Sequence, residues 1–297
     1  MLNHRTTDNR AVLCNDKALV FSVLTLIAGL VLAFYLVFFC RTYVLAANLN
    51  RHKSAATVPA RAPAQSVYPQ FRSSSGTIRW LNEQMPLKVF VSHGTTLDKI
   101  IDEESGVPVC NVGNLAHWPD LAASAIEKEG ELQNQPVAEG FCPEHYDAAV
   151  QGISFWKRFE KDGLFSFQFT DDPSDADIYV FWVNHFVGNN GMALFASDIR
   201  GYTAKRSFWL KDIQSGKRPP FKPVVIVLRT TDAVGRPMAL AKMRASAAHE
   251  FGHALGIEGH SGDPHDLMSV YYGNGTISNN DAATIRYLYH LVPDLVP

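Results

Sequence analysis

Two histidines four residues apart, with a glutamate directly after the first, are the part of this sequence best suited to chemistry. They are His249, Glu250 and His253. On an α-helix, residues four apart lie on the same face, so the two imidazoles could bind one metal ion. Glu250 lies one step round such a helix, beside the ion rather than among its ligands, where a general base acts. The pattern predicts a zinc site with one position open for water, whose pKa zinc lowers to about 7.

A third histidine follows the pair. Gly256 comes three residues after His253, and glycine at a helix C-terminus accepts the positive φ that turns the chain back. His260 comes next and is the expected third ligand, with Asp263 and His265 as the alternatives. Without a metal, His249 and His253 alone would be histidines of an ordinary helix, either solvated or packed in the core.

Together these residues resemble the signature of the metzincin zinc endopeptidases, H-E-x-x-H-x-x-G-x-x-H followed by a methionine turn. Within that group the chain is most similar to the matrixins, which read H-S-x-D-P-x-x-x-M from the third histidine, as this chain does from His260. The resemblance implies that the three histidines bind Zn²⁺ and that Glu250 is the general base. It also implies that Met268 forms a hydrophobic floor under the zinc.

The spacing before the third histidine departs from the family. It lies four residues after the glycine instead of three, because Ile257-Glu258-Gly259 replaces a two-residue spacer. Gly259 has no side chain that could replace the histidine as a ligand, so we interpret the change as a one-residue insertion in the return loop. The irregularity motivates one alternative function, a non-catalytic, membrane-tethered binding domain that retains the metzincin shell. A zinc hydrolase acting on a non-peptide amide is a second alternative.

Two segments are candidates for contact with a substrate. The resemblance implies that residues 191–196 form an antiparallel edge strand above the cleft, where Ala193 and Leu194 could pair with an extended peptide. An ordinary edge or loop segment is the alternative. After the methionine turn, Tyr272 matches the tyrosine of the matrixin pattern M-x-P-x-Y, whereas Val270 replaces its proline. The cleavage specificity of the family therefore does not carry over to this chain.

The strands and helices expected around these residues indicate an α+β fold. Apolar patterning, and for the edge segment the resemblance, predict strands over residues 87–91, 164–170, 177–183, 191–196 and 223–230. Helices are expected over residues 119–129, 143–161, 238–255 and, after a cap at 279–281, up to 291. The resemblance implies a metzincin-type fold: a mixed, twisted five-stranded sheet, an active-site helix and a small C-terminal subdomain, with the cleft between the two halves.

The N-terminal part differs in composition from this domain. Residues 1–17 are polar and would form a cytoplasmic tail, whereas residues 18–40 contain no charged side chain. At about 1.5 Å per residue, the second stretch would cross a hydrocarbon core of about 30 Å as one transmembrane helix. A cleavable signal peptide has an apolar core of only about 7–15 residues, so we expect a retained anchor, with cleavage near residues 46–47 as the alternative. Residues 41–76 read as a Pro/Ala/Ser-rich linker, and residues 77–297 as the catalytic domain.

Charge and cysteine content limit the partners and the location. A net charge of −2 leaves no electrostatic footprint for nucleic acid. The basic residues that flank the apolar span are nearly balanced, and the linker beyond it favours an extracytoplasmic domain. There, Cys110 and Cys142 could form a disulfide or remain separate thiols. We therefore expect a single-pass, membrane-anchored zinc endopeptidase that acts on proteins or peptides, with its oligomeric state left open.

Overall fold

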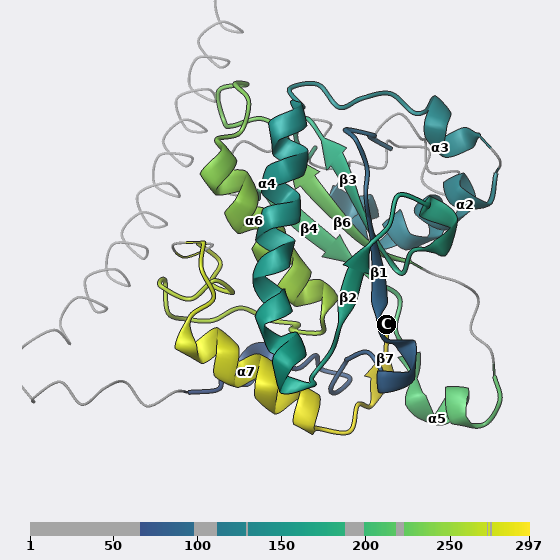
Figure 1. Ribbon diagram of the computed structural model, residues 1–297, viewed down its shortest axis with the longest axis vertical. Coiled ribbons are helices and arrows are strands. Elements are labelled where there is room, and N and C mark those ends of the chain that lie inside the picture. Colours follow the sequence, from purple (N-terminus) through teal and green to yellow (C-terminus); the bar gives the residue numbers. More distant parts are fainter. Residues whose placement is uncertain are drawn as a thin grey trace, which may run out of the picture. The chain divides into compact units, whose positions relative to one another are not determined.

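The computed structural model describes the part of the chain that holds the candidate site (Figure 1). The chain divides into two compact units, Met1–Pro63 and Ala64–Pro297, and the described residues all belong to the second. Among them, no helix has the length and apolar character needed to cross a membrane. The predicted anchor at 18–40 lies outside the described residues, which are 66–97, 112–128, 130–187, 199–217, 223–271, 273 and 275–297.

A five-stranded sheet forms the centre of this unit, in the order β2-β1-β3-β6-β4. Four strands are parallel to their neighbours, and β4 runs antiparallel to β6 at the edge. The prediction of a mixed five-stranded sheet is therefore confirmed. The strands are β1 Leu87–Val91, β2 Phe167–Phe169, β3 Ile178–Val183, β4 Gly201–Ala204 and β6 Val224–Arg229. A separate two-stranded ribbon pairs β5 Phe208–Trp209 with β7 Leu295–Val296.

One strand prediction differs from the structure, and another falls on residues that the structure does not describe. β2 is shorter than predicted, because Leu164 and Phe165 pack into the core before the strand begins. The segment 191–196, predicted as the antiparallel edge strand, lies outside the described residues. The antiparallel edge strand of the described chain is β4, whose Gly-Tyr-Thr-Ala sequence is too short and too polar for apolar patterning to detect.

Alternating side chains of the strands build a hydrophobic core on each face of the sheet. On one face, α4 and α6 pack side by side (Figure 1) and bury Ile153, Trp156 and Phe251 together with Val180 and Ile226. The other face is covered in part by α2, whose Trp118 packs among the intervening strand residues. The predicted helix 143–161 is α-helical only at first and continues as the 3-10 helix η4. The α-helices are α2 Trp118–Glu127, α3 Glu131–Asn134, α4 Pro143–Ser154, α5 Leu210–Gln214, α6 Leu240–Ala254 and α7 Asn279–His290. The 3-10 helices are η1 Pro69–Phe71, η2 Asn82–Gln84, η3 Val112–His117, η4 Phe155–Asp162 and η5 Pro173–Asp175.

Below the sheet, the chain that follows α6 forms a loop-rich half completed by α7. The cap of α7 is Ser278, one residue before the predicted position, and its hydroxyl accepts a hydrogen bond from the amide of Asp281. Residues 66–76, which the sequence places in the linker, pack against this half. Tyr68 and Phe71 are buried there, and the amide of Tyr68 donates to the hydroxyl of Thr284 on α7. These residues of the predicted linker thus pack as part of the compact unit.

Candidate metal centre

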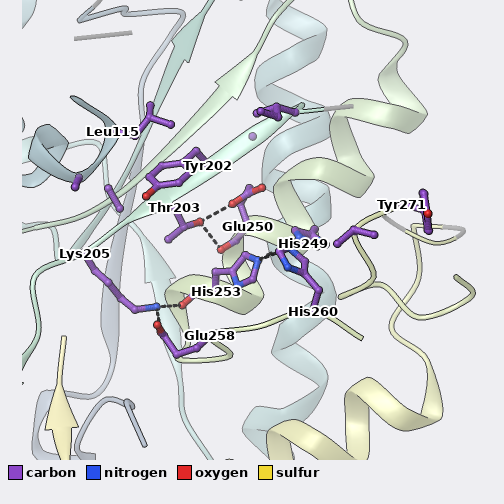
Figure 2. A pocket seen from close by; sticks show the side chains of 15 residues that line it. Leu115, Tyr202, Thr203, Lys205, His249, Glu250, His253, Glu258, His260 and Tyr271 are labelled. Atoms are coloured by element: carbon purple, nitrogen blue, oxygen red, sulfur yellow. Dashed lines mark hydrogen bonds and ion pairs between the residues drawn. The ribbon is translucent and has the colours of Figure 1, made fainter. Parts of the chain in front are cut away.

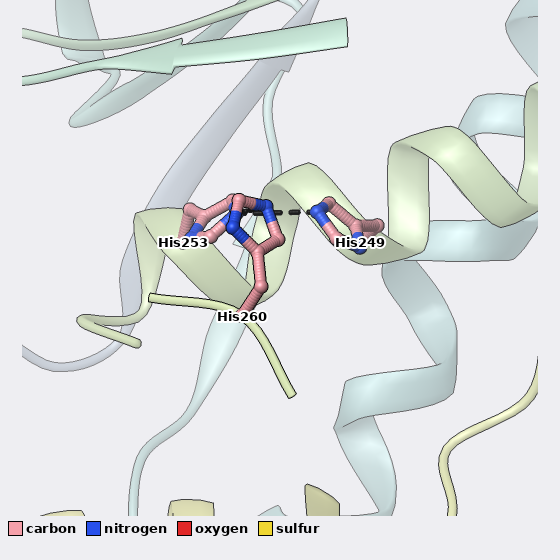
Figure 3. Close-up of side chains that lie close together, drawn as sticks. All are labelled: His249, His253 and His260. Carbon is pink, nitrogen blue, oxygen red and sulfur yellow. Dashed lines mark hydrogen bonds between the residues drawn. The ribbon is translucent and has the colours of Figure 1, made fainter. Parts of the chain in front are cut away.

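Three imidazole rings meet at the C-terminal end of α6 (Figure 3). His249 and His253 lie on the helix, and His260 comes from the return loop. The Nε2 atom of His253 is 3.2 Å from Nε2 of His249 and 3.3 Å from Nε2 of His260. Within the described residues, no other group of His, Cys, Asp and Glu side chains converges closely enough to hold a metal ion. The structure therefore brings together the three histidines that the sequence selected.

Backbone carbonyls orient two of these rings. Nδ1 of His249 lies 2.7 Å from the carbonyl oxygen of Leu267, and Nδ1 of His253 lies 2.6 Å from that of Ile257. Because a carbonyl only accepts hydrogen bonds, Nδ1 carries the proton and the Nε2 lone pair is left for a metal. Three imidazole nitrogens suit Zn²⁺, which takes nitrogen ligands in a tetrahedral set. The residues present therefore fit a zinc ion.

Loss of hydration favours the neutral form of all three rings. It lowers the pKa of His249 to about 4 and holds the pKa of His253 well below its usual value, with the neighbouring rings adding to the effect. His260 is the most exposed of the three, and partial loss of hydration lowers its pKa as well. A ring must be neutral to bind a metal through Nε2, so at neutral pH no proton has to leave first.

The return loop accommodates the additional residue of the spacer. Gly256 has φ +114°, and a Cβ at this position would lie 2.1 Å from the carbonyl oxygen of Ile78, so glycine is required on both counts. Two residues later, the amide of Glu258 donates to the carbonyl of Phe71 at 3.1 Å. The longer spacer thus rests on the N-terminal segment, and His260 still reaches the other two rings.

The two alternative ligands do not join this group. Asp263 and His265 contact each other, with Oδ1 and Nδ1 2.9 Å apart. Both side chains are exposed, at 48% and 86% of their surface. Within the described chain, the third position of the cluster belongs to His260.

Glu250 lies beside the imidazoles in an open pocket of about 760 Å³ (Figure 2). Its side chain is buried, and its Oε2 atom accepts a hydrogen bond of 2.8 Å from the hydroxyl of Thr203. A buried carboxylate next to three converging imidazoles and open to a pocket has the placement of a general base. The pocket is lined by Leu115, Ala116, Ile199, Gly201, Tyr202, Thr203, Ala204, Lys205, His249, Glu250, His253, Glu258, His260, Val270 and Tyr271.

Met268 is completely buried against the helix that carries the first two histidines. A Cβ placed on Gly252 would lie 2.4 Å from its sulfur atom, so the thioether packs directly on α6 between the positions of His249 and His253. The residue before it, Leu267, supplies the carbonyl that orients His249. The methionine segment and the imidazole cluster are thus in direct contact.

Asp281 of α7 holds this methionine segment in place, and the sequence indicated only a capping role for it. Its carboxylate accepts hydrogen bonds from the amides of Leu267 at 2.8 Å and Met268 at 3.2 Å. It also accepts one from the hydroxyl of Tyr68 at 3.3 Å. The side chain is fully buried. A chain of contacts therefore runs from Asp281 through Leu267 to His249.

Replacing Asp281 with asparagine is expected to destabilise the fold. The amide group keeps the shape but turns an NH₂ toward backbone N–H donors, and a buried donor left without an acceptor costs about 1–3 kcal/mol. For a domain of this size, the melting temperature should fall by about 2–4 °C per kcal/mol. Thermal unfolding measures the change, with the exposed Asp263→Asn as the matched control. Equal melting temperatures for the two variants would contradict this role of Asp281.

The family comparison agrees with this geometry. Residues 148–290 match the family model of the matrixins, a stretch that runs from α4 to the end of α7 and includes all three histidines. This part of the chain is a matrixin domain. The chain is also similar to the 72 kDa type IV collagenase of Gallus gallus, with 48% identity over 54 residues. That match covers 17% of this chain and only 8% of the collagenase, so the two proteins share a short stretch.

Several residues singled out by the sequence lie outside the described part of the chain. Ala193, Leu194 and Tyr272, predicted to contact the substrate, lie outside the described residues. Cys110 does as well, so its pairing with Cys142 stays untested, although Cys142 has a free thiol in the structure.

The matrixin domain also has a charged pair in its pocket that the sequence did not indicate. The ammonium group of Lys205 lies 2.5 Å from Oε1 of Glu258 and donates to the carbonyl of His253 at 2.6 Å (Figure 2). Lysine and glutamate are 10% and 22% exposed, so the pair is largely shielded from solvent. Because Glu258 belongs to the lengthened spacer, this pair links the spacer to the chain that follows β4. No local sequence pattern relates two residues so far apart.

Proposed function

We propose that this chain is a zinc-dependent endopeptidase. The observation that carries the proposal is the convergence of three neutral imidazoles beside the buried carboxylate of Glu250, in a pocket large enough for a peptide segment. Membership of residues 148–290 in a metallopeptidase family supports it independently. In this proposal His249, His253 and His260 are the zinc ligands, and Met268 forms the apolar surface beneath them.

The chemistry divides between the metal and the chain. A zinc ion held by the three imidazoles would supply a Lewis acid and lower the pKa of water at the site to about 7. Glu250 accepts the proton of the attacking water and later donates it to the nitrogen of the leaving amine. The carbonyls of Leu267 and Ile257 keep two of the imidazoles in the tautomer that leaves Nε2 available.

Zinc analysis combined with peptide digestion tests this function. The full chain, purified in detergent, is expected to contain one zinc per molecule and to cleave a mixed peptide library at internal bonds. Chelation should abolish cleavage, and added zinc should restore it. Stoichiometric zinc without cleavage of any peptide would contradict the endopeptidase and favour hydrolysis of another amide. Absence of bound zinc would favour a binding domain.

We further propose that residues 18–40 anchor this peptidase in a membrane, with the catalytic domain on the extracytoplasmic side. The support is the uncharged, apolar composition of the span and the linker that follows it. The full chain should stay with the membrane fraction after alkaline carbonate extraction. The double change Leu26→Lys and Leu32→Lys should release it, because a lysine at the centre of a span costs about 2.5–3.5 kcal/mol. Retention of that variant would contradict a spanning anchor.

A further inference from the structure

Thr203 is the residue of β4 whose hydroxyl reaches the side chain of Glu250 (Figure 2). Its Oγ1 atom lies 2.8 Å from Oε2 of Glu250 and 2.9 Å from the backbone carbonyl oxygen of the same residue. A hydroxyl has one proton to donate, and both oxygens can accept it. A bond to an ionised acceptor is the stronger of the two, so the carboxylate is the favoured partner.

The strand on which Thr203 lies faces Glu250 at a second position. Gly201 precedes it by two residues and therefore lies on the same face of the strand. A Cβ at Gly201 would be 2.6 Å from Cγ of Glu250 and 2.9 Å from Oε1, so only glycine leaves room for the side chain. β4 thus offers Glu250 an open space at one residue and a hydrogen-bond donor at the next on that face.

Pairing with a buried strand fixes the position of this face. Gly201 is paired with Leu228 and Thr203 with Ile226, both completely buried residues of β6. The donor is therefore carried by the sheet, while the carboxylate is carried by α6. A hydrogen bond between them restricts the terminal torsion of the glutamate, which is otherwise broad and roughly two-fold.

We propose that Thr203 is a positioning residue for the peptidase reaction, whose hydroxyl holds the Glu250 carboxylate in one orientation within the pocket. The inference rests on the proposed function, because it assigns a partner to the general base of that reaction. Proton transfer depends on geometry, and misplacement of a reacting group by about 1 Å can cost about 100-fold in rate. Loss of the hydroxyl should therefore reduce kcat and leave substrate binding and zinc binding intact.

Substitution of Thr203 by valine, with serine as the conservative control, tests the proposal. Valine keeps the shape and removes the hydroxyl, and kcat is expected to fall about 10- to 100-fold with KM and zinc content unchanged. Thr203→Ser retains the donor and should restore kcat to nearly that of the wild type. Wild-type kcat in Thr203→Val would overturn the proposal. A serine variant as slow as the valine variant, or loss of zinc in Thr203→Val, would overturn it as well.

A double-mutant cycle gives a readout that does not depend on catalysis. The melting temperatures of zinc-loaded wild type, Thr203→Val, Glu250→Ala and the double variant are compared. If the hydroxyl and the carboxylate interact, the double variant loses less than the sum of the two single losses. Additive losses would overturn the proposal. If the wild type cleaves no peptide, the endopeptidase function fails, and the cycle still decides whether Thr203 holds Glu250.

Discussion

Replacing Glu250 with glutamine is expected to abolish peptide hydrolysis while the zinc stays bound. The amide has nearly the size of the carboxylate, and its oxygen still accepts a hydrogen bond from Thr203, so the pocket should keep its shape. An amide cannot take a proton from water at neutral pH, and loss of a general base lowers rates by about 100- to 10,000-fold. The measurement is kcat/KM on a fluorogenic peptide, combined with the zinc content of the same sample.

The same substitution at a surface glutamate controls for effects that do not arise from the site. Glu83 in η2 is exposed, and Glu83→Gln should have wild-type kinetics and zinc content. A Glu250→Gln variant that retains zinc and cleaves at the wild-type rate would show that another group takes the proton.

Replacing His260 with alanine should remove both the metal and the activity. Two imidazoles on one helix would be left to hold the ion. The imidazole removed has its Nε2 atom 3.3 Å from Nε2 of His253. Loss of an outer partner of a metal ligand already costs about 10- to 100-fold in affinity, and loss of the ligand itself should exceed that. Competition with a calibrated chelator measures the zinc affinity, and peptide hydrolysis is measured in parallel.

His265 provides the matched control for this change. It lies five residues further along the same loop, exposed and paired with Asp263, so His265→Ala should bind zinc and cleave peptides as the wild type does. If His260→Ala kept its zinc while His265→Ala lost it, the assignment of the third ligand would be wrong, and the loop would have rearranged to bring His265 inward.

The sequence predicted the parts of the fold and site that depend on local spacing. Four residues separate His249 from His253, so any helix brings their rings together, and the helix itself was evident from the surrounding pattern. Continuous apolar runs likewise identified β3 and β6, because strands buried on both faces need apolar residues at every position. His260 was indicated despite the altered spacing, because the sequence that follows it matches the matrixin pattern H-S-x-D-P-x-x-x-M.

Residues that act over long separations were not predicted. Thr203 lies 47 positions before Glu250, and only the antiparallel placement of β4 brings the two together. Asp281 looked like a capping residue, and its carboxylate does accept a hydrogen bond from the amide of the cap, Ser278. Its contacts with Leu267 and Met268, however, depend on how α7 packs. Such roles come from tertiary structure, and a single sequence has no local signal for them.

The contacts of residues 66–71 have a consequence for the order in which this protein would acquire the proposed zinc ion. The spacer that carries His260 rests on the carbonyl of Phe71, and Tyr68 bonds to Asp281, 213 positions away. Contacts between such distant parts of a chain form slowly, because the loop between them must close first. The helical pair His249 and His253 can form with α6 alone, whereas the third ligand arrives only when both ends of the domain have met. Tight zinc binding should therefore occur only after residues 66–71 have packed against the C-terminal half of the domain, that is, only in the completely folded protein.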